Sequence, residues 1–178
     1  MNMRALLLVA AVAAPLAACE TGGYYPMPQP YPGGGGYNPG YPGTPDYGQQ
    51  PNYGSTNLVA GFTPDPRIVN LSSGGSIDAS QTVGSGCRGY ITSAPDYRVN
   101  YQAGGYPLII SVASNTDTTL VINGPNGQYT CDDDSGNGTN PSVRFNNPQS
   151  GQYDIWVGTY GSASSAPASL YISEVSSQ

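Results

Sequence analysis

Residues 152–159 read QYDIWVGT, and this stretch decides the fold because apolar and polar side chains alternate along it. Successive side chains of a β-strand point to opposite faces. One face of this strand is therefore apolar and predicts a core-facing surface formed by Tyr153, Ile155 and Val157. The other face carries Asp154 beside Trp156, the single tryptophan of the chain. Two interpretations of this pair stay open: an exposed surface that binds a ligand, or a tryptophan covered by a loop or by the preceding linker.

Similar short segments recur outward from this stretch at a spacing of about 8–12 residues, which is typical of a β-sandwich or barrel. Turn-forming residues separate them, as in NGPNG at 123–127 and NPQSG at 147–151. No segment shows the apolar periodicity of a helix, so we expect an all-β domain over residues 57–178 with almost no helix. The candidate strands are Arg67–Leu71, Ser76–Ala79, Arg88–Thr92, Tyr97–Tyr101, Pro107–Ala113, Thr119–Asn123, Gln128–Cys131, Ser142–Asn146, Gln152–Gly158 and Ser169–Ser173.

The composition excludes several classes of protein. The 178 residues include 11 Asp and Glu but only 5 Lys and Arg, so the net charge is −6 and no basic cluster points to nucleic acid. The chain has no His and no Lys. It therefore lacks the bases of Ser-His-Asp and Ser-Lys hydrolases, and also the commonest zinc ligand. We expect neither an enzyme nor a nucleic-acid-binding protein.

Residues 1–19 resemble the export signal of a bacterial lipoprotein. The apolar run at 5–14 is too short for the roughly 20 residues of a membrane-spanning helix and is typical of a secretory signal peptide. LAA at 16–18 precedes Cys19, as in the lipobox, where the cysteine thiol receives diacylglycerol. We expect a signal peptide over 1–18 and an acylated Cys19, palmitate included, that anchors the protein in the cell envelope, with the outer membrane favoured. The alternative is a plain signal peptide cleaved beside an unmodified cysteine.

Residues 19–56 form a predicted linker. From 20 to 56 the chain contains no Leu, Ile or Val and repeats short motifs such as YPG at 31–33 and 41–43. Proline removes hydrogen-bond donors and glycine is entropically costly to order, so we expect a disordered, partly polyproline-II segment. Its tyrosines have two interpretations: a spacer that lifts the domain off the bilayer, or side chains that self-associate or stack on polysaccharide or peptidoglycan.

Two cysteines remain if Cys19 carries lipid. In an oxidising envelope compartment, Cys87 and Cys131 favour a disulfide over a metal pair. The bond would close a loop of about 45 residues and stabilise the domain by roughly 4 kcal/mol in the chain-entropy model. Free buried thiols are the alternative.

The order of several motifs resembles the bacterial pre-peptidase C-terminal domain family, which is found beside secreted proteases and in stand-alone envelope proteins. The resemblance covers roughly Ile91 to Ser173 and implies a jelly-roll-like antiparallel β-sandwich. It rests on DTTL at 117–120, GPNG at 124–127, CDDDSG at 131–136 and PQSGQYDIWVGTY at 148–160. Thr119 stands where the family often has a second aspartate, and Asn140-Pro141 stands where it often has a glutamate.

Some members of that family bind calcium, and this chain has a possible site. Ca²⁺ is held by carboxylate, amide and carbonyl oxygens. The loop after residue 131 supplies Asp132, Asp134 and Asn137, and Asp117 precedes a neighbouring strand. The two departures from the family pattern both remove carboxylates and so weaken the site. The alternative is that the acids simply keep a solvated loop from pairing edge to edge.

Together these observations predict a lipid-anchored envelope protein that displays a non-catalytic β-sandwich for binding or for envelope structure. Its expected ligands are polysaccharide, peptidoglycan or an envelope protein. The alternative function is an accessory or chaperone-like partner of a secreted or surface protein or protease.

Overall fold

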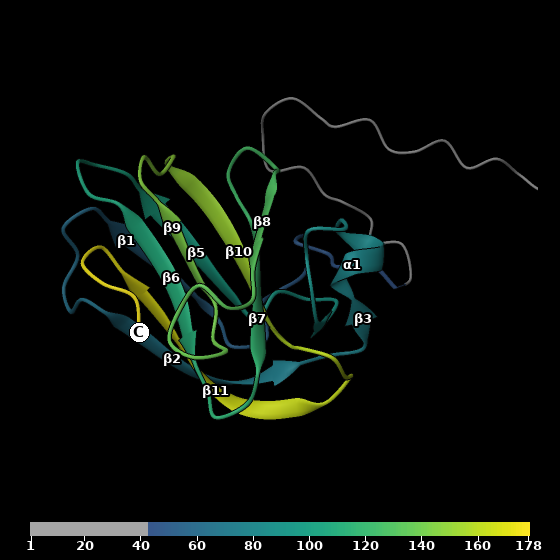
Figure 1. Cartoon of the computed structure of the whole chain (residues 1–178). Helices are drawn as coiled ribbons and strands as arrows, with labels where there is room; N and C mark the ends of the chain where they lie inside the picture. Colours follow the sequence, from purple (N-terminus) through teal and green to yellow (C-terminus); the bar gives the residue numbers. More distant parts are fainter. Residues whose placement is uncertain (1–42) are drawn as a thin grey trace, which may run out of the picture. The chain divides into compact units, whose positions relative to one another are not determined.

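The structure is a computed structural model that describes residues 43–178. The predicted signal peptide, Cys19 and most of the predicted linker lie outside the described residues. Within them, eleven strands and one short helix build two sheets (Figure 1). The elements are β1 (Ser55–Val59), β2 (Arg67–Gly74), β3 (Ile77–Asp78), α1 (Ala79–Thr82), β4 (Tyr90–Ile91), β5 (Tyr97–Gln102), β6 (Leu108–Ala113), β7 (Thr118–Asn123), β8 (Tyr129–Asp132), β9 (Ser142–Phe145), β10 (Gly151–Thr159) and β11 (Ser165–Ser173).

Strand β10 is the centre of the first sheet, here called sheet A. Its first half pairs antiparallel with β5, with Tyr153 opposite Val99. Its second half pairs antiparallel with β7, with Trp156 opposite Val121. Beyond these neighbours lie β1 and β8, and β4 and β3 extend the end of β10. The outer strand β1 runs parallel to β5, so the predicted sandwich is not antiparallel throughout.

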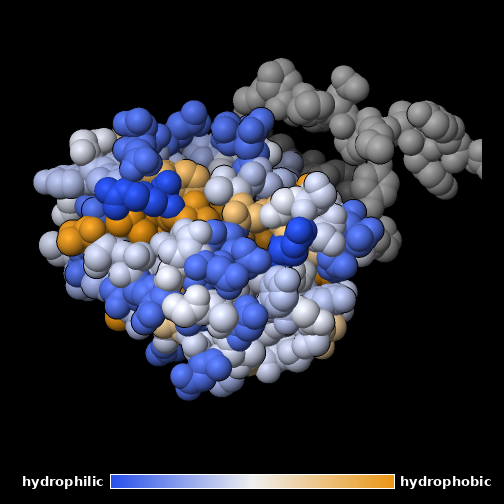
Figure 2. Space-filling model, viewed as in Figure 1, coloured by the Kyte–Doolittle hydropathy of each residue, from blue (hydrophilic) through white to orange (hydrophobic). Residues whose placement is uncertain are grey.

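The second sheet, sheet B, has the strand order β2-β11-β6-β9 and packs on sheet A through the main core. The apolar face predicted for residues 152–159 lies in this core, where Ile155 and Val157 are fully buried. Sheet B contributes Leu170, Ile172 and Ile110 to the same cluster. Burial of each such side chain stabilises the fold by about 1.5–3 kcal/mol. Hydrophilic residues cover most of the face seen in Figure 2, and hydrophobic ones gather in a band across its left half.

A second, smaller apolar cluster covers the opposite face of sheet A. The segment from β3 to β4, which contains α1, folds back over β7 and β10 and is fastened to β8 by the Cys87–Cys131 disulfide. The predicted disulfide is therefore confirmed. The buried members of this cluster are Ile77, Ala79, Cys87, Ile91, Val121 and Trp156, with Tyr47, Val83, Tyr129 and Cys131 packed against them.

A buried carboxylate provides a hydrogen-bond acceptor for β10 just beyond the end of its pairing with β5. Asp96 immediately precedes β5, and its backbone N–H donates to Ile155 O at 2.8 Å. Its side chain, only 1% exposed, then accepts the next free N–H of β10, that of Val157, at 2.7 Å. Asn52 Nδ2 donates to the other carboxylate oxygen at 3.3 Å. Desolvation by burial raises the pKa of Asp96 to about 7, and these hydrogen bonds oppose the rise.

The all-β prediction is confirmed, and all ten expected strands are present with altered ends. Strand β1 was not expected, because it begins inside the segment whose composition indicates a linker. The expected strand over 76–79 shortens to β3, because Asp78 caps α1 by accepting a hydrogen bond from Ser80 N at 2.9 Å.

Loss of the disulfide should destabilise the folded domain. The bond closes a loop with a sequence separation of 44, so replacing Cys87 and Cys131 together by Ala should cost up to about 4 kcal/mol of unfolding free energy. Urea denaturation followed by Trp156 fluorescence measures the change. Dithiothreitol should shift the midpoint of the wild type and leave that of the double variant unchanged. Equal wild-type midpoints with and without reductant would contradict this expectation.

Asp96 should make the domain less stable as the pH rises. Its pKa is about 7 in the fold and 3.8 ordinarily, so the folded state binds the proton more tightly, and stability falls between about pH 4 and pH 7. Asp96→Asn removes this charge, so the unfolding free energy should fall less over this pH range, by an amount on the order of 4 kcal/mol at most. Burial raises the pKa of Asp154 as well, so part of the slope should remain.

Urea denaturation at several pH values between 4 and 8 tests this expectation. Asp134→Asn, which neutralises an exposed acid of the 132–141 loop, is the matched control; its charge affects the pKa of Asp117, so it should change the slope far less than Asp96→Asn does. An Asp96→Asn variant with the same pH dependence as the wild type would show that the buried carboxylate does not set the slope.

Candidate functional site

Residues 46–54 form a strap that lies on the outer face of sheet A and leads into β1. Four backbone hydrogen bonds hold it: Asp46 N to Ser93 O at 2.7 Å, Asn52 N to Pro95 O at 2.8 Å, Tyr53 N to Asp96 O at 2.8 Å and Arg98 N to Gly54 O at 3.2 Å. The strap belongs to the folded domain, so the predicted boundary at residue 57 is wrong by about ten residues. Composition misplaced it because the strap has no aliphatic core residues and is held mainly through its backbone.

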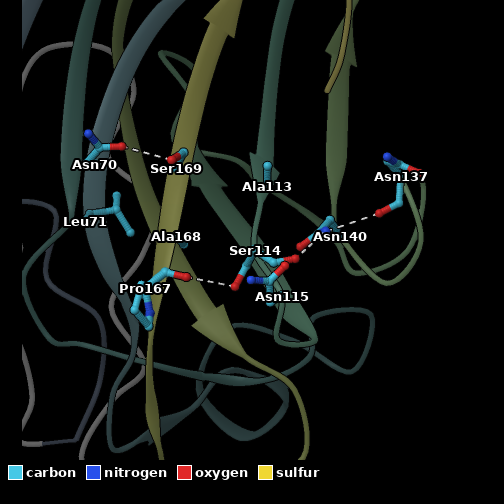
Figure 3. Close-up of a pocket in the computed structure, with 10 residues that line it drawn as sticks. All are labelled: Asn70, Leu71, Ala113, Ser114, Asn115, Asn137, Asn140, Pro167, Ala168 and Ser169. Atoms are coloured by element: carbon cyan, nitrogen blue, oxygen red, sulfur yellow. Dashed lines mark hydrogen bonds between the residues drawn. The ribbon is translucent and has the colours of Figure 1, made fainter.

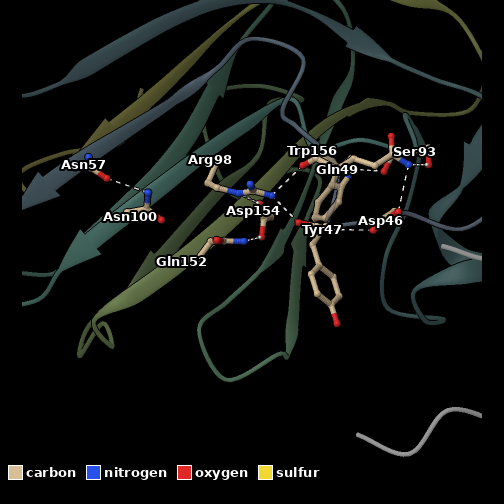
Figure 4. Close-up of polar contacts among 11 residues, drawn as sticks. Asp46, Tyr47, Gln49, Asn57, Ser93, Arg98, Asn100, Gln152, Asp154 and Trp156 are labelled. Atoms are coloured by element: carbon tan, nitrogen blue, oxygen red, sulfur yellow. Dashed lines mark hydrogen bonds and ion pairs between the residues drawn. The ribbon is translucent and has the colours of Figure 1, made fainter. Parts of the chain in front are cut away.

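Arg98 clamps the strap to the sheet (Figure 4). Its guanidinium donates to Asp154 Oδ1 at 2.6 Å and to the backbone oxygens of Tyr47 and Gln49. Gln152 Nε2 donates to the second oxygen of Asp154 at 2.7 Å. Burial raises the pKa of Asp154, and the hydrogen bonds from Gln152 and Arg98 oppose the rise. Because both carboxylate oxygens have partners, Asp154 is a structural anchor of the strap.

The predicted binding surface of Asp154 and Trp156 is wrong, because neither side chain reaches solvent. Asp154 is 1% exposed and Trp156 is fully buried. The indole N–H donates to Ser93 O at 3.3 Å, and the ring packs near Tyr129 with a centroid separation of 6.2 Å. The alternative interpretation holds: Tyr47 of the strap and the disulfide-linked segment cover the tryptophan.

The predicted calcium ligands do not come together as one set. Asp132 accepts hydrogen bonds from Ser135 N, Ser135 Oγ and Ser142 N at 2.6–3.0 Å, so it closes its own loop. Burial, followed by the charges of Asp134 and Asp133, raises the pKa of Asp117. One buried oxygen of Asp117 has no hydrogen-bond partner in the described part of the chain. Within residues 43–178, no three acidic or cysteine side chains gather in a geometry that would hold a metal ion. Calcium binding therefore stays a prediction.

An open groove of about 490 Å³ runs along one end of sheet B. Figure 3 shows Asn70 and Ser169 on one side of it, Asn137 and Asn140 on the other, and Ala113 between them. All of its lining side chains are uncharged, and six are amides or hydroxyls. The lining residues are Asn70, Leu71, Ala113, Ser114, Asn115, Asn137, Asn140, Pro167, Ala168 and Ser169. We call this the asparagine groove.

The loop wall of the asparagine groove is held in place by Asn140. Its amide nitrogen donates to Ser114 O at 3.0 Å and to Asn137 O at 3.2 Å, while its oxygen accepts from Thr118 Oγ1 at 2.9 Å. The backbone of Gly136 approaches Asn140 O so closely that a Cβ atom there would lie 2.6 Å from it. These contacts fix the shape of the wall before any ligand arrives.

A second polar surface lies on sheet A beside the strap. Asn57, Asn100 and Gln152 occupy neighbouring positions on β1, β5 and β10. Asn100 Nδ2 donates to Asn57 Oδ1 at 2.9 Å. All three are exposed and border a shallow depression of about 290 Å³. This amide row borders a smaller depression than the asparagine groove.

The asparagine groove is not evident from the sequence. Its residues come from β2, β6, β11 and two loops, and single asparagines and serines scattered along a chain carry no pattern. Of its lining residues, the sequence pointed only to Asn137, as a calcium ligand, and to Asn140, as a departure from the family pattern. The one indication of such a surface in the sequence is its composition, which is poor in charged residues and rich in residues with amide and hydroxyl side chains.

The chain has little similarity to known proteins outside one family match. No helix in residues 43–178 has the length and apolar character that a membrane-spanning segment needs. No curated protein matches the chain. The crystal structure of Aeromonas hydrophila PliG, a periplasmic lysozyme inhibitor of g-type lysozyme, aligns with 67% of this chain and 96% of that chain at 13% identity and a TM-score of 0.37. That overlap is too loose to carry an argument about this chain.

A family model gives a direct match to the centre of the domain. The match covers residues 94–159, which run from the residues before β5 to the end of β10. It lies within the Ile91–Ser173 region over which the sequence shows its resemblance. That resemblance is therefore confirmed: residues 94–159 match the bacterial pre-peptidase C-terminal domain.

Proposed function

We propose that this protein is a lipid-anchored component of the bacterial cell envelope whose β-sandwich binds a ligand without catalysing a reaction. The observation that carries the binding role is the asparagine groove, a concave surface with a preformed wall and an uncharged lining. Ligand sites in proteins are typically concave and largely preformed, with a few polar groups that orient the ligand.

The absence of catalysis is supported by where the acids lie. General acid-base chemistry requires a titratable group within reach of a bound substrate. The chain has no His and no Lys. The buried Asp96 accepts the backbone N–H of Val157, and the buried Asp154 is paired with Arg98. No carboxylate lines the asparagine groove.

Two chemical features of the chain support the envelope location. The lipobox-like LAAC at 16–19 supplies the acceptor for diacylglycerol, and the Cys87–Cys131 disulfide suits an oxidising compartment. The strap then fastens the end of the linker to sheet A, leaving the groove of sheet B unobstructed by residues 46–54.

Substitution of the predicted lipid acceptor tests the anchor. Cys19→Ala should abolish metabolic labelling with palmitate and move the protein from the membrane pellet to the soluble fraction, because several acyl chains are lost. The matched control replaces Cys87 and Cys131 by Ala, which removes the other thiols and should keep the label. An unlabelled wild type, or a Cys19→Ala variant that stays in the membrane pellet, would refute the proposed anchor.

Neutralising Asp117 tests the predicted calcium site. Burial and the charges of Asp134 and Asp133 raise its pKa, so its ionised form costs stability above that pKa, and Asp117→Asn should raise the melting temperature at pH 7 in EGTA. A bound calcium ion would relieve the same repulsion. Millimolar calcium should then raise the melting temperature of the wild type more than that of the variant. Identical wild-type melts in calcium and in EGTA would remove calcium from the account.

A further inference from the structure

We propose that the asparagine groove binds a segment of a neutral polysaccharide. This inference rests on the proposed binding function and adds to it the site and the chemical class of the ligand. The proposed site is therefore the asparagine groove on sheet B, and not the surface of Asp154 and Trp156 on sheet A that the sequence predicted.

The groove presents hydrogen-bonding groups that the protein itself leaves unused. Asn70 accepts a hydrogen bond from Ser169 Oγ at 2.9 Å, and this contact orients its amide nitrogen without occupying it. The side chains of Asn115 and Asn137 are exposed and have no hydrogen-bond partner in the part of the chain that the structure describes. An amide both donates and accepts, so such groups pair well with sugar hydroxyls, which do the same.

The floor between these groups suits the face of a sugar ring. It is formed by the small or flat apolar groups of Ala113 and Pro167, because Ala168 points to the opposite face of β11 and belongs to the main core. Ser114 Oγ donates to Pro167 O at 2.9 Å and ties the floor to the wall. A pyranose ring has apolar C–H groups on its faces and hydroxyls around its rim, which matches a narrow apolar floor bordered by amides. Without an aromatic side chain in the lining, each sugar should bind weakly, with affinity arising from several sugars of one chain.

The electrostatics favour an uncharged glycan over an anionic one. The chain carries a net charge of −6, and the loop that forms the groove wall begins with Asp132, Asp133 and Asp134. No arginine lines the groove to pair with a carboxylate or sulfate. An anionic polymer would therefore be repelled without compensation.

The same lining disfavours a protein partner at this site. Protein interfaces derive most of their affinity from tyrosine, tryptophan or arginine anchors in a desolvated centre. The large hydrophobic side chains exposed on the described part of the chain are Tyr53, Val59, Ile68, Tyr106, Tyr160 and Val175, and none of them lines the groove.

Affinity electrophoresis of the mature, detergent-solubilised protein tests the proposal. Native gels would contain hydroxyethyl cellulose, dextran or galactomannan as neutral probes, or polygalacturonate as the anionic probe. At least one neutral glycan should retard the wild type, and polygalacturonate should not. The double variant Asn70→Ala with Asn115→Ala should weaken the retarding interaction at least about tenfold, because two neutral hydrogen-bonding groups are lost. Asn115→Asp, which removes two donors without changing side-chain size, should weaken it as well.

The amide row of sheet A supplies the matched control. Asn57→Ala with Asn100→Ala removes the same number of exposed amides from the opposite sheet and should leave retardation unchanged. Equal melting temperatures would show that all variants are folded. The proposal is overturned if no neutral glycan retards the wild type, if the sheet A variant rather than the groove variant loses binding, or if groove substitutions instead release a stoichiometric protein partner.

Those outcomes do not contradict the proposed function, that of a lipid-anchored envelope protein that binds a ligand without catalysis. That function fails separately, if Cys19 proves unmodified or if the purified protein turns over a substrate.

Discussion

The constraint on which the structure depends is that β10 carries large side chains on both faces, so both faces of sheet A must be covered. Ile155 and Val157 are buried against sheet B, as in any sandwich. Trp156 lies on the other face and would expose a large apolar surface there. The chain covers it from two directions, with the disulfide-linked segment around α1 and with Tyr47 of the strap. Sheet A is therefore covered on its outer face by a third, irregular layer.

Because this layer lies on sheet A, the two sheets have different roles. Sheet A holds the end of the linker through Arg98, whose guanidinium reaches both Asp154 and the backbone of the strap. Among residues 43–178, nothing covers the row formed by Asn70 and Ser169 on sheet B, and the asparagine groove opens there. In the proposed function, attachment and ligand binding therefore use different surfaces.

The acids of the domain show why a carboxylate near the centre of a fold is not by itself a sign of catalysis. Asp96 takes the place of a missing strand partner for Val157, and Asp132 closes a loop through Ser135 and Ser142. A buried donor left without a partner costs about 1–3 kcal/mol. These carboxylates meet that need, so their role is structural. The groove, by contrast, contains no titratable group.

The sequence by itself determined the all-β class, because alternation along segments such as 152–159 fixes which side chains share a face. It also predicted the pairing of Cys87 with Cys131, which the structure confirms, and it excluded His and Lys as general bases, since both are absent from the chain. Only the tertiary structure decided which faces are covered. Alternation places Trp156 opposite the core but says nothing of the strap, whose backbone hydrogen bonds leave no side-chain pattern. The amides of Asn70 and Asn115 in the groove are likewise brought together by long-range pairing of β2, β6 and β11, which no local pattern encodes.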